Sequence, residues 1–377
     1  MFDALNHQAK SIGIVGAGIL GRLIAWQLQS LGLKVTLFDK DPIFGGTAAS
    51  YTAAGMLAPY CELEHSEPLI YDLGQRSLEL WPNIVESLQA ENFFHQAGTL
   101  VIAHAQDQSD LNHFNQLLNQ RLGSCDDLAF LNQHQLQQIE PELQHNFKEA
   151  TYLKNESWIY TREFLDIIAD QLLANGVVWH GLCEVMRVDK RKVITQKQTF
   201  NFDCVVDCRG MGAKLDVPQL RGVRGELLFI EAPDVNFKHM VRLMHPRYRL
   251  YLVPRDNHRY ILGATQIENE DYSPISVRSA LELLSALYSV HPGFSEARIL
   301  ETRTNCRPAV LDNLPFIQKA DGIIRVNGLY RHGFLMAPAL AEHVIADITQ
   351  QAPPQIIGSL YRLNDQPLSH SRYRESV

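Results

Sequence analysis

The amino-acid sequence predicts a two-domain α/β fold, in which a domain with a parallel sheet is assembled from separate pieces of the chain. Three observations favour this architecture. A strand–helix–strand unit opens the chain, short apolar strands follow residue 176, and the segment from Gly222 to Gly263 alternates like an antiparallel sheet. We therefore expect an α+β domain, dominated by that antiparallel sheet, to be inserted between the pieces of the first domain.

The opening unit lies between Ser11 and Asp39. Its first run, SIGIVG, is a short apolar stretch that ends in glycine, as buried parallel strands do. From Ile19 onward the apolar residues recur near helical spacing, and Gly32 provides a C-terminal stop. The run KVTLFD then predicts a second strand that ends at Asp39.

The rest of the chain continues to alternate between helices and strands. Residues 69–138 are helix-rich and polar around the strand-like run GTLVIA, and a helix is expected from Thr161, as its N-cap, to Asn175. Further helices are expected over about 276–290 and over 336–348. The predicted division is a nucleotide-binding domain of residues 1–85, 151–222 and 306–352, a substrate domain of residues 86–150 and 223–305, and a C-terminal tail of residues 353–377.

Composition places the chain among ordinary globular proteins, because 46% of its 377 residues are hydrophobic. The formal net charge is −8, and an acidic surface repels phosphate backbones, so nucleic acid is not an expected partner. The first ten residues lack the apolar core of a signal peptide, and no apolar run reaches the ~18–20 residues of a membrane span. A cytoplasmic protein without membrane association is expected.

The six cysteines are scattered without metal-ligand spacing, so we expect free thiols and no metal site.

The strongest local motif is the glycine-rich sequence Gly16-Ala17-Gly18-Ile19-Leu20-Gly21, which lies between the first strand and the first helix. The first glycine permits a tight turn, the second lets a pyrophosphate approach the backbone, and the third lets the helix pack on the strand. Asp39 follows 23 residues (39 − 16) after Gly16, where its carboxylate can accept hydrogen bonds from a ribose and would repel a 2′-phosphate. The sequence therefore predicts a Rossmann-like dinucleotide site, and at this point both NAD and FAD remain open.

Three further segments distinguish between these two cofactors. They are FGGTAASYTAAGMLAPYCELE at 44–64, FDCVVDCRGMGA at 202–213 and RVNGLYRHGFLMAPALAE at 325–342. In this order they resemble the FAD contacts of the D-amino-acid-oxidase-like flavoprotein superfamily, and within it the chain is most similar to the glycine oxidases of thiamine biosynthesis. The resemblance covers most of the chain. It implies FAD on a glutathione-reductase-type Rossmann-like domain, with the sheet of the interleaved α+β domain roofing the flavin.

The resemblance also implies which residues contact the FAD. Small side chains after the second strand, at Ala53, Ala54 and Gly55, would let backbone amides approach the flavin. The glycine-rich turn, the end of the second strand and the C-terminal loop with its helix are expected to contribute the other contacts. The expected cofactor-binding residues are Gly16, Gly18, Ile19, Leu20, Gly21, Asp39, Lys40, Thr47, Ala53, Ala54, Gly55, Met56, Val185, Gly210, Arg307, Gly328, Arg331, His332, Gly333, Phe334 and Leu335.

Arg307, in the run NCRPAVLDNLP, is the leading catalytic candidate, because it follows the expected end of the inserted domain. A guanidinium binds a carboxylate through two parallel hydrogen bonds, and the resemblance implies that this arginine holds the substrate carboxylate. A surface ion pair is the alternative role. Tyr251 matches a pocket tyrosine and Arg331 a second arginine near the flavin, although Tyr251 could equally pack within its strand. Arg249 should share the sheet face of Tyr251 and is a weaker candidate.

The implied reaction is the oxidation of glycine or a similar small amino acid. Arg307 and Tyr251 would hold the carboxylate, and hydride transfer to flavin N5 would give an imine that hydrolyses to glyoxylate and ammonia. Oxygen would reoxidise the flavin and leave as hydrogen peroxide. Delivery of the imine to thiazole assembly would link the enzyme functionally to a thiazole synthase, and the relatives suggest a homo-oligomer.

Two departures from the family pattern keep other substrates open. Arg303-Thr304-Asn305 stands where tryptophan-alanine-glycine often precedes the substrate arginine, and Gln266 stands where some relatives have a methionine. The nearest alternative is an oxidase of sarcosine, proline or a D-amino acid, or a dehydrogenase that passes electrons to a carrier. A flavoprotein acting on a modified tRNA base is disfavoured by the acidic charge. The non-enzymatic alternative keeps the nucleotide site without a reactive flavin.

Overall fold

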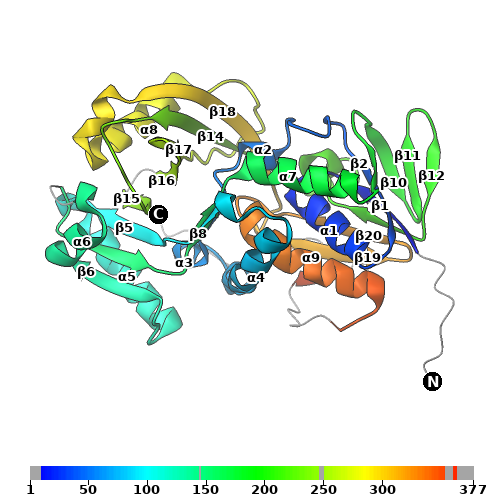
Figure 1. The fold of residues 1–377 in the computed structure, drawn as a ribbon, viewed down its shortest axis with the longest axis horizontal. Coiled ribbons are helices and arrows are strands. Elements are labelled where there is room, and N and C mark those ends of the chain that lie inside the picture. The colour runs from blue at the N-terminus through cyan, green and yellow to red at the C-terminus, as the bar shows by residue number, and fades with distance from the viewer. Residues whose placement is uncertain (1–9, 144–145, 246–249, 353–359, 363–377) are drawn as a thin grey trace. The chain divides into compact units, whose positions relative to one another are not determined.

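The computed structural model describes residues 10–143, 146–245, 250–352 and 360–362. The chain divides into two compact units (Figure 1). Unit 1 consists of Met1–Tyr51, Arg162–Gly222 and Arg307–Val377, and unit 2 consists of Thr52–Thr161 and Val223–Cys306.

Unit 1 is built on a six-stranded sheet. Its strands are β1 (Ser11–Val15), β2 (Lys34–Phe38), β9 (Val178–His180), β13 (Cys204–Asp207), β19 (Phe316–Ala320) and β20 (Ile323–Asn327). Their order across the sheet is β19-β20-β13-β1-β2-β9, and only β19, at one edge, runs antiparallel to its neighbour. A central first strand with later strands added on either side is the doubly wound arrangement of nucleotide-binding domains. The predicted parallel sheet assembled from separate segments is confirmed.

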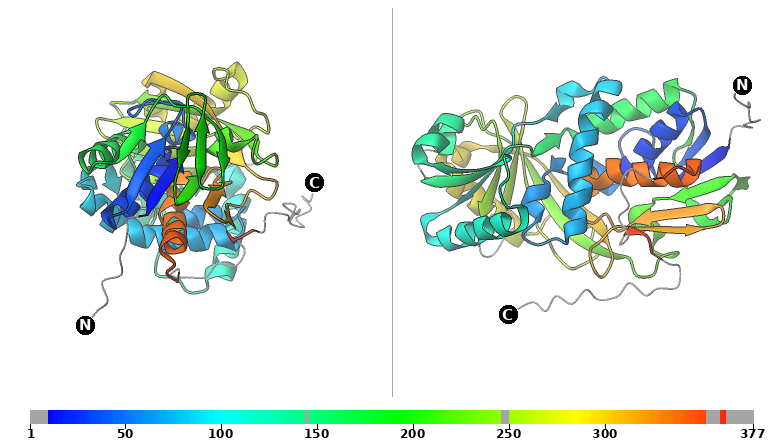
Figure 2. Two further views of the ribbon diagram at one scale, coloured as in Figure 1. Left: turned by 90° about the vertical axis from the view of Figure 1, so that its right-hand side faces the viewer. Right: turned by 90° about the horizontal axis from the view of Figure 1, so that it is seen from below.

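The helices of unit 1 follow its strands. They are α1 (Ile19–Ser30), α2 (Ala49–Thr52), α7 (Thr161–Ala174), the 3₁₀ helix η4 (Gly210–Ala213) and α9 (Gly333–Thr349), of which α2 and α7 extend by one residue across the unit boundary. Helices α1 and α9 pack against each other, as Figure 2 shows. The last helix begins three residues earlier than predicted, at Gly333, and the buried apolar residues Phe334 and Leu335 lie in its first turn.

A second, antiparallel sheet in unit 1 covers part of the larger one. It consists of β10 (Val185–Asp189), β11 (Lys192–Thr195) and β12 (Thr199–Asn201). Val188 and Val193 of this sheet pack against Val15, Phe38 and Val205 of the parallel sheet. The short strands predicted after residue 176 therefore belong to two different sheets.

Unit 2 is built on an eight-stranded sheet. Its strands are β5 (Thr99–Ala103), β6 (Leu128–Asn132), β7 (Glu149–Leu153), β14 (Arg221–Glu231), β15 (Met240–Met244), β16 (Leu250–Arg255), β17 (Arg259–Gly263) and β18 (Arg298–Ala309), where β14 and β18 run a few residues into unit 1 segments. Their order is β18-β14-β17-β16-β15-β5-β7-β6. The predicted antiparallel sheet is present, and β15 joins it in parallel to β5, which comes from the earlier segment of the unit.

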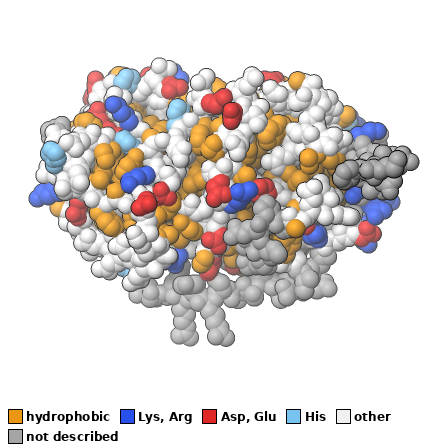
Figure 3. Space-filling model, turned by 60° about the horizontal axis from the view of Figure 1, so that its bottom comes forward, with side chains coloured by type: hydrophobic (Ala, Val, Ile, Leu, Met, Phe, Trp, Pro, Cys, Tyr) orange, Lys and Arg blue, Asp and Glu red, His pale blue; other side chains and the backbone are white. Residues whose placement is uncertain are grey.

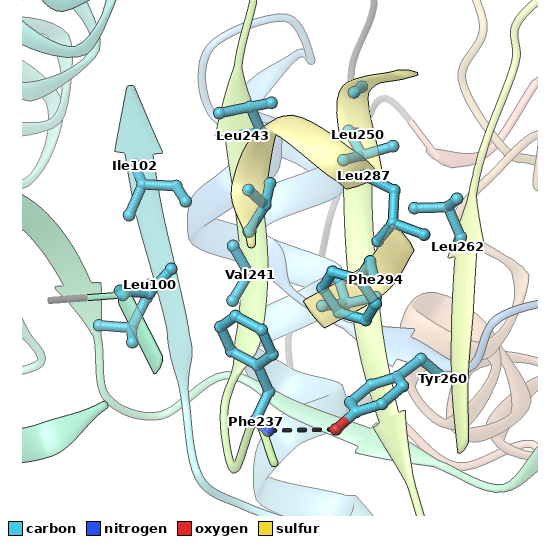
Figure 4. Close-up of a cluster of buried hydrophobic side chains, with 14 of the residues drawn as sticks. Leu100, Ile102, Phe237, Val241, Leu243, Leu250, Tyr260, Leu262, Leu287 and Phe294 are labelled. Atoms are coloured by element: carbon cyan, nitrogen blue, oxygen red, sulfur yellow. Dashed lines mark hydrogen bonds between the residues drawn. The ribbon is translucent and has the colours of Figure 1, made fainter. Parts of the chain in front are cut away.

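Both faces of this sheet are buried. On one face Leu243, Leu250 and Leu262 pack against Leu287 of α8 (Val277–Val290) and against Phe294 (Figure 4). On the opposite face Met240, Val253 and Ile261 pack with Phe114 and Leu118 of α5 (Gln108–Leu122). Because successive residues of a strand face opposite sides of a sheet, strands buried on both faces carry few polar residues.

The remaining elements of unit 2 are short apart from one 20-residue helix. They are β3 (Met56–Leu57), α3 (Pro59–Glu62), α4 (Pro68–Ser87), η1 (Glu91–Phe93), β4 (Phe94–His95), η2 (Ala105–Asp107), α6 (Gln133–Ile139), η3 (Pro141–Leu143), β8 (Ser157–Ile159) and η5 (Pro292–Glu296).

The division of the chain differs from the predicted one. Residues 52–85 and 151–161 belong to unit 2, because β3 and β4 both pair with β8 in a small antiparallel sheet. Within the predicted tail, the structure describes only residues 360–362. Leu360 is fully buried there, and Tyr361 forms a bridge with Ile317 of β19.

The six cysteines all lie in the described segments and are free thiols, as expected. None of the described helices combines the length and apolar composition of a membrane span. Acidic and basic side chains are interspersed among hydrophobic and neutral ones on the face drawn in Figure 3.

Glu156, just before β8, is a fully buried carboxylate of unit 2. One of its oxygens accepts a hydrogen bond from the Cys61 backbone N–H at 2.8 Å, and the other accepts from the Cys61 thiol at 3.3 Å. Burial raises the pKa of Glu156 to about 7. The folded protein therefore keeps a proton on Glu156 at pH values where the unfolded chain has lost it.

This difference predicts a pH-dependent stability that Glu156→Gln removes. An unfolded glutamate has a pKa of about 4.3, so the stability that protonated Glu156 contributes is complete below that pH and is lost as the pH rises through about 7. As the pH rises from 5 to 8, the wild type should lose about 2.5 kcal/mol of its free energy of unfolding relative to the variant. Urea denaturation at each pH measures this change, and an equal difference at both pH values would contradict the assignment.

Candidate active site

The glycine-rich turn connects β1 to α1 in unit 1, and the geometry accounts for each of its glycines. Gly16 has a φ of +103°, which side-chain-bearing residues rarely adopt. A Cβ on Gly21 would lie 1.9 Å from the Gly16 carbonyl oxygen, so helix α1 can approach the turn only without a side chain there. A Cβ on Gly18, the N-cap of α1, would meet only the Ser50 hydroxyl, at 3.1 Å. Of the three glycines, Gly18 is thus the one at which an added Cβ would contact only a single side-chain atom.

Asp39 follows β2 and holds this turn. Its carboxylate accepts from the Ala17 backbone N–H at 2.5 Å and from the Asp41 backbone N–H at 2.8 Å. Burial raises the pKa of Asp39, while these two hydrogen bonds act in the opposite direction. Each carboxylate oxygen can accept a further bond, so the role at a ribose hydroxyl stays a prediction compatible with the geometry.

These surroundings fit a dinucleotide with a diphosphate. The first N–H of α1, at Ile19, donates to the Ser50 hydroxyl at 3.1 Å. The N-terminal end of this helix thus binds a hydrogen-bond acceptor, as helix N-termini at anion sites do. At the start of α9, a Cβ on Gly333 would meet no protein atom within 4 Å. Backbone that approaches a ligand closely requires such open space at glycine.

The C-terminal candidates lie on one connected loop of unit 1. The Asn327 side-chain amide donates to the Gly210 carbonyl at 3.0 Å, and the Tyr330 N–H donates to the Pro308 carbonyl at 2.9 Å. These bonds bring the strand that carries Arg307 together with Gly210 and with the loop that runs from Gly328 through Arg331 to His332 and the start of α9. Arg307 and Arg331 are both partly buried.

Other cofactor candidates of unit 1 have contacts within the protein. The Thr47 N–H and hydroxyl both donate to Asp41, at 2.7 and 2.9 Å, and Lys40 is exposed. The carbonyl of Val185, at the start of β10, accepts from Arg209 at 3.5 Å. No contact in the protein tests their expected role toward FAD, which stays a prediction.

Five candidates belong to unit 2. Ala53, Ala54 and Gly55 precede Met56, the first residue of β3, and the carbonyls of the first two are occupied within the unit. Ala53 accepts from the Thr161 hydroxyl at 3.0 Å and Ala54 from Arg255 at 2.7 Å. The hydroxyl of Thr161 is thus used to fix this loop, and Thr161 is the first helical residue of α7 and not its N-cap.

Tyr251, the fifth, lies in β16 and belongs to a row of residues that crosses the sheet. It pairs with Arg242 of β15 on one side and with Gly263 of β17 on the other. Arg242 is buried, lies 5.8 Å from the centre of the Tyr251 ring, and donates to the Cys61 carbonyl at 2.9 Å. Arg249 lies outside the described residues.

Tyr60 and Gln266 of unit 2 differ in burial. Tyr60 is 2% exposed, and its hydroxyl donates to Asp127 at 2.6 Å, so it is part of the core of unit 2. Gln266 is exposed, and Thr265 before it donates to the buried Glu226 carboxylate at 2.9 Å.

The sequence analysis missed two residues at the glycine-rich turn. Arg22 is buried directly after the turn, and Ser50 contacts the first N–H of α1. A charged residue three positions after Ile19, on the apolar side of a helix, was the available indication for Arg22. Ser50 had none, because its partner lies 31 residues away in the chain.

The fold and the turn together define a dinucleotide-binding enzyme whose nucleotide unit is doubly wound and whose second unit carries a large mixed sheet. Residues 11–347 match the family model described as "DAO: FAD dependent oxidoreductase". The chain therefore belongs to the DAO family of FAD-dependent oxidoreductases, and FAD is its cofactor. The expected superfamily and cofactor are confirmed.

Individual relatives refine this picture. The "Putative thiamine biosynthesis oxidoreductase ThiO" of Rhizobium etli is 37% identical over 341 residues, which cover 90% of this chain and 97% of the relative. The "Bifunctional protein ThiO/ThiG" of Synechocystis is 26% identical, over 89% of this chain and 51% of that protein. The crystal structure of glycine oxidase from Geobacillus kaustophilus superposes with a TM-score of 0.82 at 22% identity, over 94% of this chain and 98% of that one.

Proposed function

We propose that this enzyme oxidises glycine or a similar small amino acid, with oxygen as the electron acceptor. The products are glyoxylate, ammonia and hydrogen peroxide. The observation that carries the proposal is Arg307, a partly buried guanidinium whose neighbour Pro308 is hydrogen-bonded to the loop that bears Arg331. Two comparisons support the same substrate class. One relative is named as a thiamine biosynthesis oxidoreductase, and the fold is similar to that of a glycine oxidase.

In this proposal Arg307 binds the substrate carboxylate through two parallel hydrogen bonds, and the Tyr251 hydroxyl donates a third. Bound FAD supplies the acceptor for the two electrons and the hydrogen that leave the α-carbon. The amino group enters the reaction unprotonated and loses one proton, so the chain needs no strong base. Water then hydrolyses the imine. Orientation of the α-carbon by Arg307 and Tyr251 supplies much of the acceleration.

We further propose that the imine serves thiazole assembly through a thiazole synthase. The support is the bifunctional ThiO/ThiG relative, in which the region similar to this chain makes up about half of the protein, 51%.

The test is the visible spectrum of the purified protein under anaerobic addition of glycine. We expect the flavin absorbance to be bleached and to return in air with one hydrogen peroxide per glycine oxidised. Bleaching by sarcosine, proline or a D-amino acid but not by glycine would replace the proposed substrate. Bleaching that reverses with an artificial dye but not with oxygen would make the enzyme a dehydrogenase.

A further inference from the structure

Arg22 is a buried guanidinium in the first turn of α1, directly after the glycine-rich turn, and is 1% exposed. Its Nε donates to the Ala17 carbonyl at 2.7 Å. One terminal nitrogen donates to the Ile43 carbonyl at 3.0 Å and to the Tyr51 hydroxyl at 2.9 Å, and the other donates to the Leu165 carbonyl. Arg22 therefore connects the turn to two other segments of unit 1.

All these acceptors are neutral, and none of the carboxylates in the described part of the chain forms an ion pair with Arg22. The guanidinium lies over the Trp179 and Tyr51 rings, 4.8 and 5.4 Å from their centres. Burial lowers the pKa of Arg22, yet a guanidinium stays protonated at neutral pH. Asp166, which accepts from the Tyr51 hydroxyl at 3.2 Å, and Asp39 act on this charge without bonding to it directly. Unit 1 thus contains a buried positive charge without a directly bonded counter-charge.

The position of this charge relates it to Asp39. The Ala17 N–H donates to the Asp39 carboxylate, and the Ala17 carbonyl accepts from Arg22. Ala17 therefore bonds to a negative group through its N–H and to a positive group through its carbonyl. The Asp39 carboxylate alone would repel a diphosphate that binds at the same turn. The Arg22 charge offsets that repulsion, because buried charges are weakly screened.

We propose that Arg22 is a positioning residue for the diphosphate of the dinucleotide. It fixes the Ala17 carbonyl and so the backbone of the turn, and its charge cancels the field of Asp39 where the diphosphate binds. The ribose and adenine gain nothing from this charge, because they are neutral. The contribution of Arg22 is therefore specific to the anionic part of the ligand.

The test measures the binding of FAD, ADP and adenosine to the flavin-free full-length protein, by flavin fluorescence and by competition. Arg22→Met should weaken FAD and ADP binding about 10- to 100-fold, the effect of one close charge at an intermediate dielectric, and adenosine binding less than about threefold. Arg22→Lys keeps the charge but cannot reach all four acceptors, and should keep the wild-type ratio of ADP to adenosine affinity.

The matched control is Arg191→Met, which removes an exposed arginine of unit 1 that pairs with Asp321, and it should leave all three affinities within about twofold. Equal weakening of ADP and adenosine by Arg22→Met would overturn the proposal in favour of a purely structural role. If Arg22→Met does not fold, Arg22→Lys decides: a lowered ADP-to-adenosine ratio in that variant would also overturn it.

Discussion

Replacement of Arg307 by methionine is expected to lower kcat/KM for glycine by about 10³-fold. Truncating one partner of a hydrogen-bonded charge pair costs about 2–5 kcal/mol, because the substrate carboxylate then loses both its bonds and its counter-charge. The flavin spectrum should remain, because the glycine-rich turn and α1 are unchanged. Stopped-flow reduction of the flavin under anaerobic glycine measures the loss directly.

Two matched variants sharpen this experiment. Arg307→Lys keeps the charge but not the bidentate geometry, and should recover about a tenth of the activity or less. Arg298→Met removes an exposed arginine of the same strand, paired with Glu296, and should leave kcat/KM within about twofold. A decrease of less than tenfold in Arg307→Met would show that another group binds the carboxylate.

Alanine at Gly21 and alanine at Gly18 should fail in different ways. The Gly21 Cβ would lie 1.9 Å from the Gly16 carbonyl oxygen, so α1 must move away from the turn, and we expect a loss of about 3 kcal/mol or more in the free energy of unfolding. The Gly18 Cβ would meet only the Ser50 hydroxyl, at 3.1 Å. Gly18→Ala should therefore leave the flavin-free protein within about 1 kcal/mol of wild type but weaken FAD binding by tenfold or more.

Chemical denaturation of the flavin-free proteins, with FAD titration of each, separates the two effects. Ser30→Ala, at the exposed last residue of α1, is the control, and both measurements should stay near wild type. Equal destabilisation by the Gly18 and Gly21 variants would show that Gly18 also serves packing within the protein.

The parts of the fold that depend on local sequence could be predicted. The strand before Gly16, the helix from Ile19, and the alternating strands up to Gly263 all form as expected, because period and turn chemistry are visible within a short window. The roles of the glycines in the turn could be predicted for the same reason. FAD followed from three separated segments in the correct order, and the family match confirms it.

Long-range pairing could not be predicted. The parallel pairing of β15 with β5 joins Met240 to Thr99, and nothing near either residue indicates its partner. The unit boundary was misplaced because β3 pairs with β8 about 100 residues later, as Met56 does with Trp158. Arg22 was missed because its significance arises from acceptors at Ile43 and Leu165 that only the folded chain brings close.

The interleaving of the two units imposes an order on biosynthesis. Unit 2 is complete once Cys306 has left the ribosome, whereas the parallel sheet of unit 1 still lacks β20 and the partner helix of α1. Because domains fold as units during synthesis, the second unit can form while the first waits for its C-terminal strand and helix. A released chain truncated before residue 323 should therefore contain a protease-resistant unit 2 and bind no flavin, so FAD binds only after the C-terminal segment has been synthesised.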